Sequence, residues 1–138
     1  MQVQPYLFFE GRCDEAIAFY KKAIGAEVQM LMRYKDAPEG ECAGGMKHPP
    51  DKVMHSSVTV GDSTVMLSDG NCSGKTHFDG FSLSLDARDD AQAEKLFNAL
   101  AADGGTPIVP LMSTFFASKF GMVTDRFGVT WMVLHQNQ

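Results

Sequence analysis

The spacing of hydrophobic residues along the chain changes between the period of a strand and the period of a helix. Residues 3–9 (VQPYLFF) are rich in β-branched and aromatic side chains and predict a strand. Residues 13–24 carry apolar side chains on one face at helical spacing and are followed by Gly25, so they predict a helix. Residues 26–34 return to the pattern of a strand.

The first half of the chain continues with a loop and a hairpin. Residues 37–51 contain three prolines and three glycines and predict a long loop. Residues 54–60 and 63–69 predict two strands, and the dipeptide Gly61-Asp62 between them is typical of a tight hairpin turn.

The second half repeats this order of elements. Its pattern predicts a strand, a helix with an aspartate cap and a terminal glycine pair, and three further strands: residues 80–86, 89–103, 106–112, 118–125 and 129–135. The repeat predicts an α+β fold of two βαβββ modules, about residues 1–69 and 79–138 of a single domain. Each module would leave one sheet face bare, so we expect a homodimer.

The linker between the modules, residues 70–78, contains GNCSGKT, which is similar to the end of a phosphate-binding loop. Such a loop needs four residues between its first glycine and GK-[ST], whereas three separate Gly70 from Gly74. The next segment has the period of a strand and not of a helix. We therefore interpret the stretch as a flexible linker.

Composition narrows the classes of partner. The chain has 17 acidic and 12 basic residues, a net charge of -5, and no basic stripe interleaved with aromatic residues, which argues against nucleic acid. No apolar run approaches the roughly 20 residues of a membrane span, and the first residues lack the pattern of a signal peptide. We expect a soluble cytoplasmic protein that makes no membrane contact.

The cysteines and histidines give no recognised site. Cys13, Cys42 and Cys72 are widely spaced and fit neither a disulfide framework nor a CxxC motif, so reduced thiols are expected. A zinc shell of Cys42, His48 and His55 would have a spacing that matches no common site.

Four segments carry a resemblance to a known family. Residues 5–28 (PYLFFEGRCDEAIAFYKKAIGAEV), MLSDG, GFSLSLD and KFGMVTDRFGVTWM are similar to the PhnB-like branch of the vicinal oxygen chelate superfamily, which includes glyoxalase I and bleomycin-resistance proteins. The resemblance covers nearly the whole chain and implies curved mixed sheets with helices on the outer face. Members are often labelled 3-demethylubiquinone 3-methyltransferase-like. The sequence does not support that label, because Phe9-Glu10-Gly11-Arg12 does not lead into the glycine-rich turn of a doubly wound sheet.

The resemblance also implies where metal ligands would lie. The expected positions fall on Pro5, on Gly80 (or on Phe81 one residue later), near Met66 or Ser68, and on Met132. Hard divalent ions prefer carboxylate or imidazole, and these side chains offer neither. We therefore expect neither the usual metal nor another cofactor.

The remaining expectation is a cavity for a small organic molecule. Strand alternation from Pro5, Gly80 and Met132 puts several other residues on the concave face: Leu7, Phe9, Ser82, Ser84, Thr130 and Leu134. The opposite residues would face the helices: Tyr6, Phe8, Phe81, Leu83, Leu85, Trp131 and Val133. The expected ligand-binding residues are His55, Ser68, Ser82, Ser84 and Met132, although such residues could also simply fill the interior.

The other polar candidates favour structural roles. His55 is the histidine best placed to reach the cavity, and His48, His77 and His135 are expected to be solvated. Asp69 and Asp125 fit turns better than catalysis.

Two functions stay open. One is a metal-free binding protein. The alternative is a metal-dependent lyase, isomerase or dioxygenase, whose ligands could include His55 and Glu residues of a partner chain.

Overall fold

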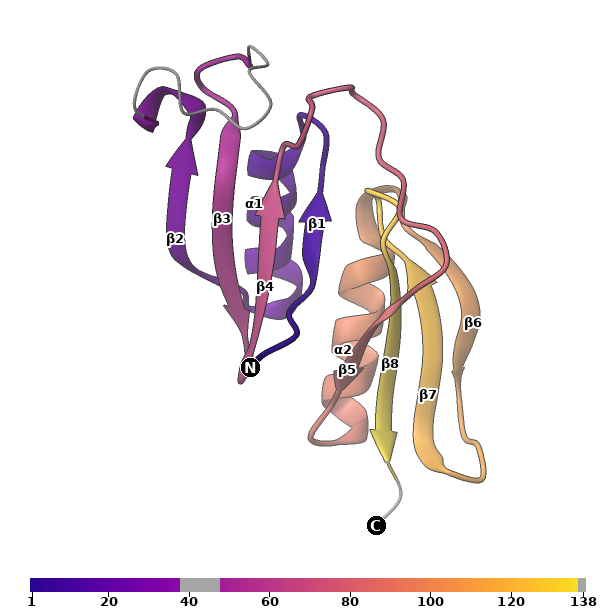
Figure 1. Cartoon of the computed structure of the whole chain (residues 1–138). Helices are drawn as coiled ribbons and strands as arrows, with labels where there is room; N and C mark the ends of the chain where they lie inside the picture. Colours follow the sequence, from indigo (N-terminus) through magenta and orange to yellow (C-terminus); the bar gives the residue numbers. More distant parts are fainter. Residues whose placement is uncertain (38–47, 137–138) are drawn as a thin grey trace. The chain divides into compact units, whose positions relative to one another are not determined.

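The structure is a computed structural model that describes residues 1–37 and 48–136 (Figure 1). The chain divides into two compact units, residues 1–76 and residues 77–138. Each unit consists of one four-stranded mixed sheet with one long helix against a single face. Cys42 and most of the predicted loop 37–51 lie outside the described residues.

Unit 1 contains one sheet with the strand order β1-β4-β3-β2. Strands β1 and β4 are parallel, and the other neighbouring pairs are antiparallel. Its elements in chain order are β1 (Tyr6–Phe8), α1 (Cys13–Ile24), β2 (Glu27–Arg33), the short helix η1 (Tyr34–Asp36), β3 (Val53–Val60) and β4 (Ser63–Ser68).

Unit 2 has the same topology, with the strand order β5-β8-β7-β6 and one parallel pair, β5 and β8. Its elements are β5 (Leu83–Asp86), α2 (Asp90–Ala101), the short helix η3 (Ala102–Gly104), β6 (Thr106–Met112), β7 (Ala117–Thr124) and β8 (Thr130–Gln136). The predicted α+β fold of two βαβββ modules is confirmed. The strand predicted over residues 80–86 begins three residues later, at Leu83.

Local sequence explains where the two helices begin and end. Helix α1 has Asp14 and Glu15 in its first turn and ends at Gly25, whose φ of 71° is left-handed. Helix α2 begins after Asp89, whose side chain accepts a hydrogen bond from the backbone N–H of Gln92. This aspartate cap is the one expected from the sequence.

The core of unit 1 corrects the predicted orientation of β1. Leu7 and Phe9 are buried, with exposed fractions of 4% and 0%, and Phe9 makes an edge-on ring contact with Tyr20 of α1. Tyr6 and Phe8 are 37% and 50% exposed. The prediction that Tyr6 and Phe8 face the helix was wrong. Its register was counted from Pro5, and a shift of one residue exchanges the two faces of a strand.

The core of unit 2 follows the predicted orientation more closely. Trp131 and Val133 are buried on the side of the sheet that α2 covers, as expected. Gly121 of β7 lies directly beneath α2, because a Cβ atom there would come within 2.8 Å of the Phe97 ring. Phe81 was expected to face the helix, but it precedes β5 and is exposed.

One buried carboxylate connects three elements of unit 1. Asp69, directly after β4, accepts hydrogen bonds from the backbone N–H groups of Gly11, Cys13 and Val53 at 3.0, 2.7 and 2.6 Å. It therefore joins the N-terminus of α1 to the start of β3. The N–H of Cys13, the first residue of α1, is therefore already used by this side chain.

A second buried carboxylate shapes the turn between β7 and β8. Asp125 Oδ1 accepts from the backbone N–H groups of Phe127 and Val129, and Oδ2 accepts from Trp131 Nε1 at 2.9 Å. These contacts explain the spacing of DRFGVTW, in which the aspartate, the turn and the tryptophan form one hydrogen-bonded unit. Asp69 and Asp125 thus have the structural roles expected of them.

The segment that follows β4 is hydrogen-bonded to unit 1. The backbone N–H of Gly74 donates to the carbonyl of Glu10, and Tyr34 Oη donates to the carbonyl of Gly70. The stretch GNCSGKT is followed by β5 and not by a helix. Within the described residues, no helix is both long and apolar enough to cross a membrane.

Candidate functional site

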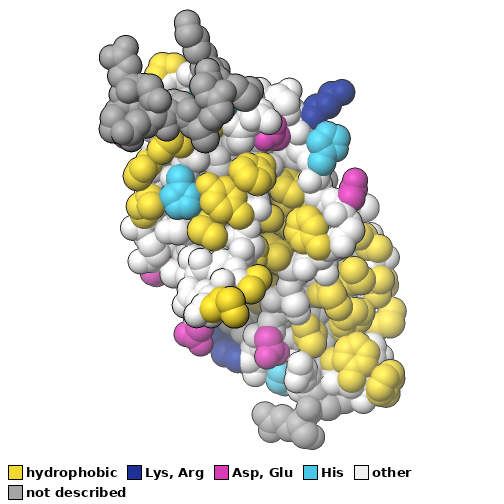
Figure 2. Space-filling model, in the orientation of Figure 1, with side chains coloured by type: hydrophobic (Ala, Val, Ile, Leu, Met, Phe, Trp, Pro, Cys, Tyr) yellow, Lys and Arg dark blue, Asp and Glu magenta, His cyan; other side chains and the backbone are white. Residues whose placement is uncertain are grey.

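The sheet face opposite the helix is open in both units (Figure 1), and hydrophobic side chains gather on it (Figure 2). In unit 1 we call this surface the Tyr6–His55 face. Strand register defines its members as Tyr6, Phe8, Met30, Met32, His55, Ser57, Met66 and Ser68. Several of these are exposed although they are large and apolar, which marks the surface as a candidate binding site.

A hydrogen-bonded pair of rings lies at the centre of the Tyr6–His55 face. Tyr6 Oη and His55 Nδ1 are 2.8 Å apart, and the two rings stack with centroids 5.5 Å apart. Phe8 extends the row, since its ring stacks on Tyr6 at 5.0 Å. The result is a continuous aromatic surface over three side chains.

The pair can form because the residue beneath it is small. Tyr6 and His55 belong to β1 and β3, which lie on either side of β4 and so are about 9.6 Å apart. Ser68 of β4 pairs with Phe8, and continuing the β3–β4 register by one residue places Ser68 opposite His55. A serine leaves room for the two rings to meet across β4.

Ser68 itself is buried, and its hydroxyl contacts both the backbone and the Tyr6 phenol. It accepts from the N–H of Gly70 at 2.9 Å and donates to the carbonyl of Val53 at 3.4 Å. The structure therefore places Ser68 on the same face as His55, as the floor of the aromatic row.

The Tyr6–His55 pair keeps a hydrogen-bond donor in either arrangement of its protons. If Tyr6 donates to Nδ1, the neutral imidazole carries its hydrogen on Nε2; if Nδ1 donates, the phenol hydrogen remains. Burial raises the pKa of the Tyr6 phenol above its ordinary value, so the phenol is protonated at neutral pH. One polar hydrogen of the pair is therefore not used by their mutual hydrogen bond.

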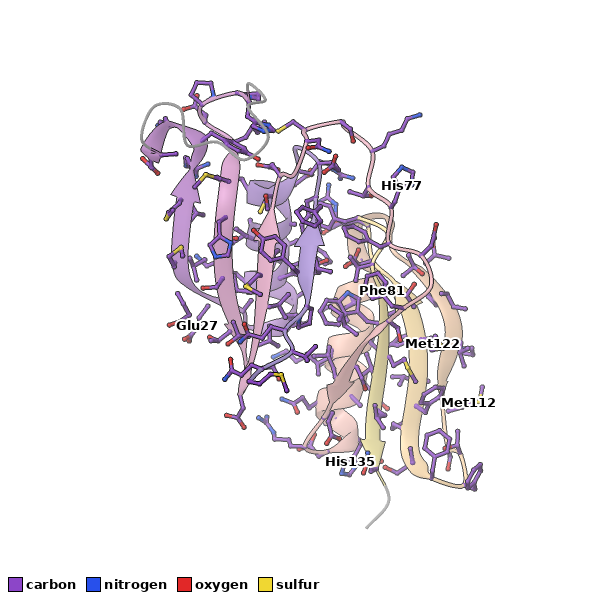
Figure 3. All side chains as sticks on the ribbon, viewed as in Figure 1. Glu27, His77, Phe81, Met112, Met122 and His135 are labelled. Atoms are coloured by element: carbon purple, nitrogen blue, oxygen red, sulfur yellow. The ribbon has the colours of Figure 1, made fainter. Side chains whose placement is uncertain are left out.

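The open face of unit 2 carries the other predicted site residues. Ser84 of β5 pairs with Met132 of β8, and Met132 pairs with Met122 of β7. Met112 of β6 lies one strand further (Figure 3). Ser82 precedes β5 and is half-buried. Ser84 and Met132 are thus strand neighbours in one unit, and His55 and Ser68 are near neighbours in the other.

Two of the remaining histidines differ from the expectation of solvated side chains. His135 is half-buried, and its Nδ1 lies 3.0 Å from Asp90 Oδ1 and 3.0 Å from Ser118 Oγ. The Ser118 hydroxyl, which donates to Asp90 Oδ1, and after it the contact with His135 hold the pKa of Asp90 below its ordinary value. His48 stacks on Tyr34 with ring centroids 4.1 Å apart, whereas His77 is exposed in the segment before β5 (Figure 3).

The positions that the resemblance implied for metal ligands carry no carboxylate or imidazole side chain. The carbonyl of Pro5 accepts a hydrogen bond from the N–H of Met66, and Gly80 precedes β5 with a φ of 81°. Met132 provides a thioether, which suits soft ions. Within residues 1–37 and 48–136, no three His, Cys, Asp or Glu side chains are grouped so that they could hold a metal ion.

Sequence reasoning missed Tyr6 and Phe8, the residues that give the face its aromatic character. Both were assigned to the helix side of β1. The residues YLFF are all apolar, so they contain no alternation from which the phase of β1 could be read. The contact between Tyr6 and His55 has no local signal, since 49 residues separate them.

Comparison with known proteins gives the same class as the fold. The sequence profile of the 3-demethylubiquinone-9 3-methyltransferase family matches residues 1–134. Protein YjdN of Escherichia coli (strain K12) is 37% identical over 139 residues, which cover 96% of this chain and 94% of that protein.

Solved structures are also similar. The crystal structure of protein PA1353 from Pseudomonas aeruginosa has a TM-score of 0.82 at 40% identity and covers 100% of this chain and 99% of that one. PhnB protein from Bacillus cereus, described as a putative 3-demethylubiquinone-9 3-methyltransferase, has a TM-score of 0.77 at 26% identity, with 98% and 99% covered. A glyoxalase-related enzyme from Fulvimarina pelagi, at 14% identity, shares the fold with a TM-score of 0.65 over 99% of this chain and 88% of that one.

Two βαβββ units, each with a helix on one face and an open face on the other, give this chain the fold of a glyoxalase-related class of proteins. Within this class the chain belongs to the PhnB-like family, whose profile is described as 3-demethylubiquinone-9 3-methyltransferase.

Proposed function

We propose that this protein binds a small organic molecule and does so without a metal ion at the usual superfamily position. The observation that carries the proposal is the Tyr6–His55 pair, which lies on an open sheet face among exposed apolar side chains. A surface with a large apolar area and few polar groups is typical of small-molecule sites. Ser82, Ser84 and Met132 are proposed as ligand-binding residues of unit 2.

Methyl transfer from S-adenosylmethionine is not part of the proposal, because the residues do not fit that cofactor. Such enzymes hold it with a glycine-rich turn and a helix N-terminus of a doubly wound sheet. Here the corresponding N–H groups of Gly11 and Cys13 donate to Asp69, and the sheets are four-stranded with mixed strand directions.

The absence of the usual metal is supported by Gly80 and Met132, which carry no donor that hard ions prefer. Pro5 does not bear on it, because β1 turns Tyr6 and not Pro5 toward the open face. Divalent ions such as Zn²⁺ require three or four nitrogen, oxygen or sulfur ligands. A metal-dependent lyase, isomerase or dioxygenase would need ligands from other positions or from a partner chain.

Metal analysis of the purified protein tests this point. The protein would be incubated with Zn²⁺, Ni²⁺, Mn²⁺ or Fe²⁺, exchanged into chelated buffer, and its metal content measured. We expect less than stoichiometric metal in every case, for the native protein and for His55→Ala alike. Stoichiometric metal in the native protein that is lost in His55→Ala would contradict the proposal and favour the enzyme.

Ligand binding is tested by thermal shift with a library of small organic molecules, followed by calorimetry. Bound ligand raises the melting temperature because it stabilises the folded state only. We expect hits whose effect is lost in His55→Ala and retained in His77→Ala, which removes an exposed imidazole elsewhere. A library without hits, or with hits that are insensitive to His55, would count against the proposed site.

We further propose that the protein is a homodimer and that it is located in the cytoplasm. We also propose that the two units belong to a single domain. Exposed apolar side chains of unit 2 support a partner copy, among them Ile108, Met112 and Phe116. Cys13 and Cys72 are free thiols, which supports a reducing compartment.

A further inference from the structure

We propose that the ligand of the Tyr6–His55 face is a flat, uncharged aromatic molecule that carries a hydrogen-bond acceptor. This proposal deepens the binding function proposed above and rests on it. Three independent features of the face lead to it: the shape of its aromatic row, the charge of its surroundings, and the polar hydrogen that its central pair retains.

The shape follows from the row Phe8, Tyr6 and His55. Adjacent rings are inclined by only 30° and 29°, so their faces form a nearly continuous surface. Aromatic rings attract one another in offset stacks over surfaces of this kind. A saturated, puckered ligand of the same size would touch this surface at fewer atoms and lose dispersion contacts.

Methionines surround the row and suit a polarisable ligand. Met30 and Met32 of β2 are exposed on the same face, and Met66 of β4 pairs with Tyr6. Thioethers make favourable contacts with the edges of aromatic rings, and their flexible side chains adapt to ligands of different outline. The face therefore favours aromatic character without fixing one exact ring system.

The charged side chains near the Tyr6–His55 face favour an uncharged ligand over an anionic one. Strands β1, β3 and β4 place no lysine or arginine on the Tyr6–His55 face. Two carboxylates lie near its limits: Glu10, whose Oε2 accepts from the N–H of Asn71, and Glu27, opposite Thr59 at the far end of β2 (Figure 3). Glu27 is about 13 Å along the strand from His55. Arg33, at the end of β2, pairs with Asp14 of α1. Among residues 1–37 and 48–136, these four strands therefore offer no unpaired cation to an anion that loses its hydration there.

The acceptor follows from the hydrogen-bond count of the central pair. In either proton arrangement one hydrogen, on His55 Nε2 or on Tyr6 Oη, is not used by their mutual bond. A carbonyl, ether or nitro oxygen on the ligand would accept it. Net hydrogen bonds of this kind contribute a factor of about 3 to 10 in affinity.

Four probes separate these features. Naphthyl methyl ketone is flat, uncharged and carries an acceptor. Ethylnaphthalene has its shape without the acceptor, cyclohexyl methyl ketone has the acceptor without the flat ring, and naphthoate is flat but anionic. Binding is followed on the full-length protein by NMR of isotope-labelled methionine methyl groups, whose signals report both affinity and location.

We expect naphthyl methyl ketone to shift the methyl signals of Met30, Met32 and Met66. Its affinity should exceed that of cyclohexyl methyl ketone and of naphthoate by at least about tenfold. In the double variant Tyr6→Phe with His55→Phe, which keeps two rings and removes both donors of the pair, the preference for the ketone over ethylnaphthalene should fall to about one. His77→Ala serves as the control and should bind as the native protein does.

Ser68 provides a separate test of the aromatic row. Ser68→Leu should force the rings of Tyr6 and His55 apart, because a larger side chain would occupy the space that they share. The affinity for naphthyl methyl ketone should then fall by at least about tenfold. Ser68→Ala keeps that space, so it should retain the affinity even though a hydrogen bond to the backbone is lost. Equal losses in both variants would contradict the role assigned to the row.

The outcomes also separate this inference from the binding function. If naphthoate or cyclohexyl methyl ketone bound as tightly as naphthyl methyl ketone and shifted the same methyl signals, the ligand class would be wrong and the binding site would stand. If no probe shifted those signals, the ligand class would be overturned, and the library screen above would decide the binding function independently.

Discussion

At the scale of single residues, Asp125 shows how one side chain fixes a turn. Its carboxylate is buried and accepts from two backbone N–H groups and from the indole of Trp131. Asp125→Asn keeps the shape but replaces one acceptor oxygen with an NH₂ donor. At least one buried donor would then face another donor, so we expect a loss of about 1–3 kcal/mol in the free energy of unfolding.

A double-mutant cycle measures how much the hydrogen bond between Asp125 and Trp131 contributes to the free energy of unfolding, which is obtained from chemical denaturation. Trp131→Phe removes the indole N–H, so Asp125→Asn should cost less in that background than in the native protein. Equal costs in both backgrounds would mean that the indole hydrogen bond does not contribute to the effect.

Cys13 leads to a prediction about alkaline pH. Burial, with the nearby Asp69 carboxylate, raises the pKa of the Cys13 thiol from 9.0 to about 12. The folded pKa lies above the unfolded value, so the stabilising effect is complete below about pH 9 and is lost as the pH rises toward 12. Between these values the free energy of unfolding should fall by up to about 1.4 kcal/mol per pH unit from this group.

The control for this prediction is Cys13→Ala, which removes the thiol and keeps the other groups that titrate at high pH. Urea denaturation of both proteins from about pH 8 to pH 11 should give a steeper decline for the native protein. If the free energy of unfolding declined equally with pH in the native protein and in Cys13→Ala, the assigned titration of Cys13 would be wrong. The protonated, buried thiol should also resist alkylation in the folded protein at neutral pH.

At the scale of elements, the contact of α2 with β7 depends on the absence of a side chain at Gly121. A Cβ atom would lie 2.8 Å from the Phe97 ring and 3.1 Å from Leu111 Cδ2. Gly121→Ala should therefore destabilise unit 2 by about 1–3 kcal/mol, because the ring or the helix must move.

Asn98→Ala is the matched control, since Asn98 lies on the exposed face of α2. Thermal unfolding should show a lower midpoint for Gly121→Ala and little change for Asn98→Ala. An unchanged midpoint in Gly121→Ala would mean that α2 is free to shift on the sheet without loss of stability.

At the scale of the whole molecule, the open sheet faces lead to the prediction of a dimer. Ile108, Met112 and Phe116 of unit 2 are exposed, and Phe115 at the tip between β6 and β7 is 95% exposed. Light scattering should report twice the mass of one chain at micromolar concentration. Met112→Asp with Phe116→Asp should shift the equilibrium toward the monomer, because charges would be buried in the interface.

The control for the dimer is the charge substitution Asn98→Asp on the solvent face of α2, which should leave the mass unchanged. A native protein that is monomeric at micromolar concentration would overturn the proposed dimer. It would leave the fold of each unit unaffected, since each has its own core.

The sequence alone determined the order and type of the elements. Helix α1 was predicted over the residues that form it, and the hairpin of β3 and β4 and the aspartate cap of α2 were found, because periodicity, capping residues and turn dipeptides are local signals. The family followed from motifs such as DRFGVTW, which is itself a local hydrogen-bonded turn.

Only the tertiary structure decided which face of a strand meets the helix and which residues meet across the sheet. Strand β1 has three residues, too few for alternation to set its phase, so packing of Leu7 and Phe9 beneath α1 turned Tyr6 outward. Tyr6 then contacts His55 across β4 because Ser68 is small, and this depends on pairing among three strands distant in sequence. The chemistry of the candidate site thus arises from long-range register, which a local pattern does not contain.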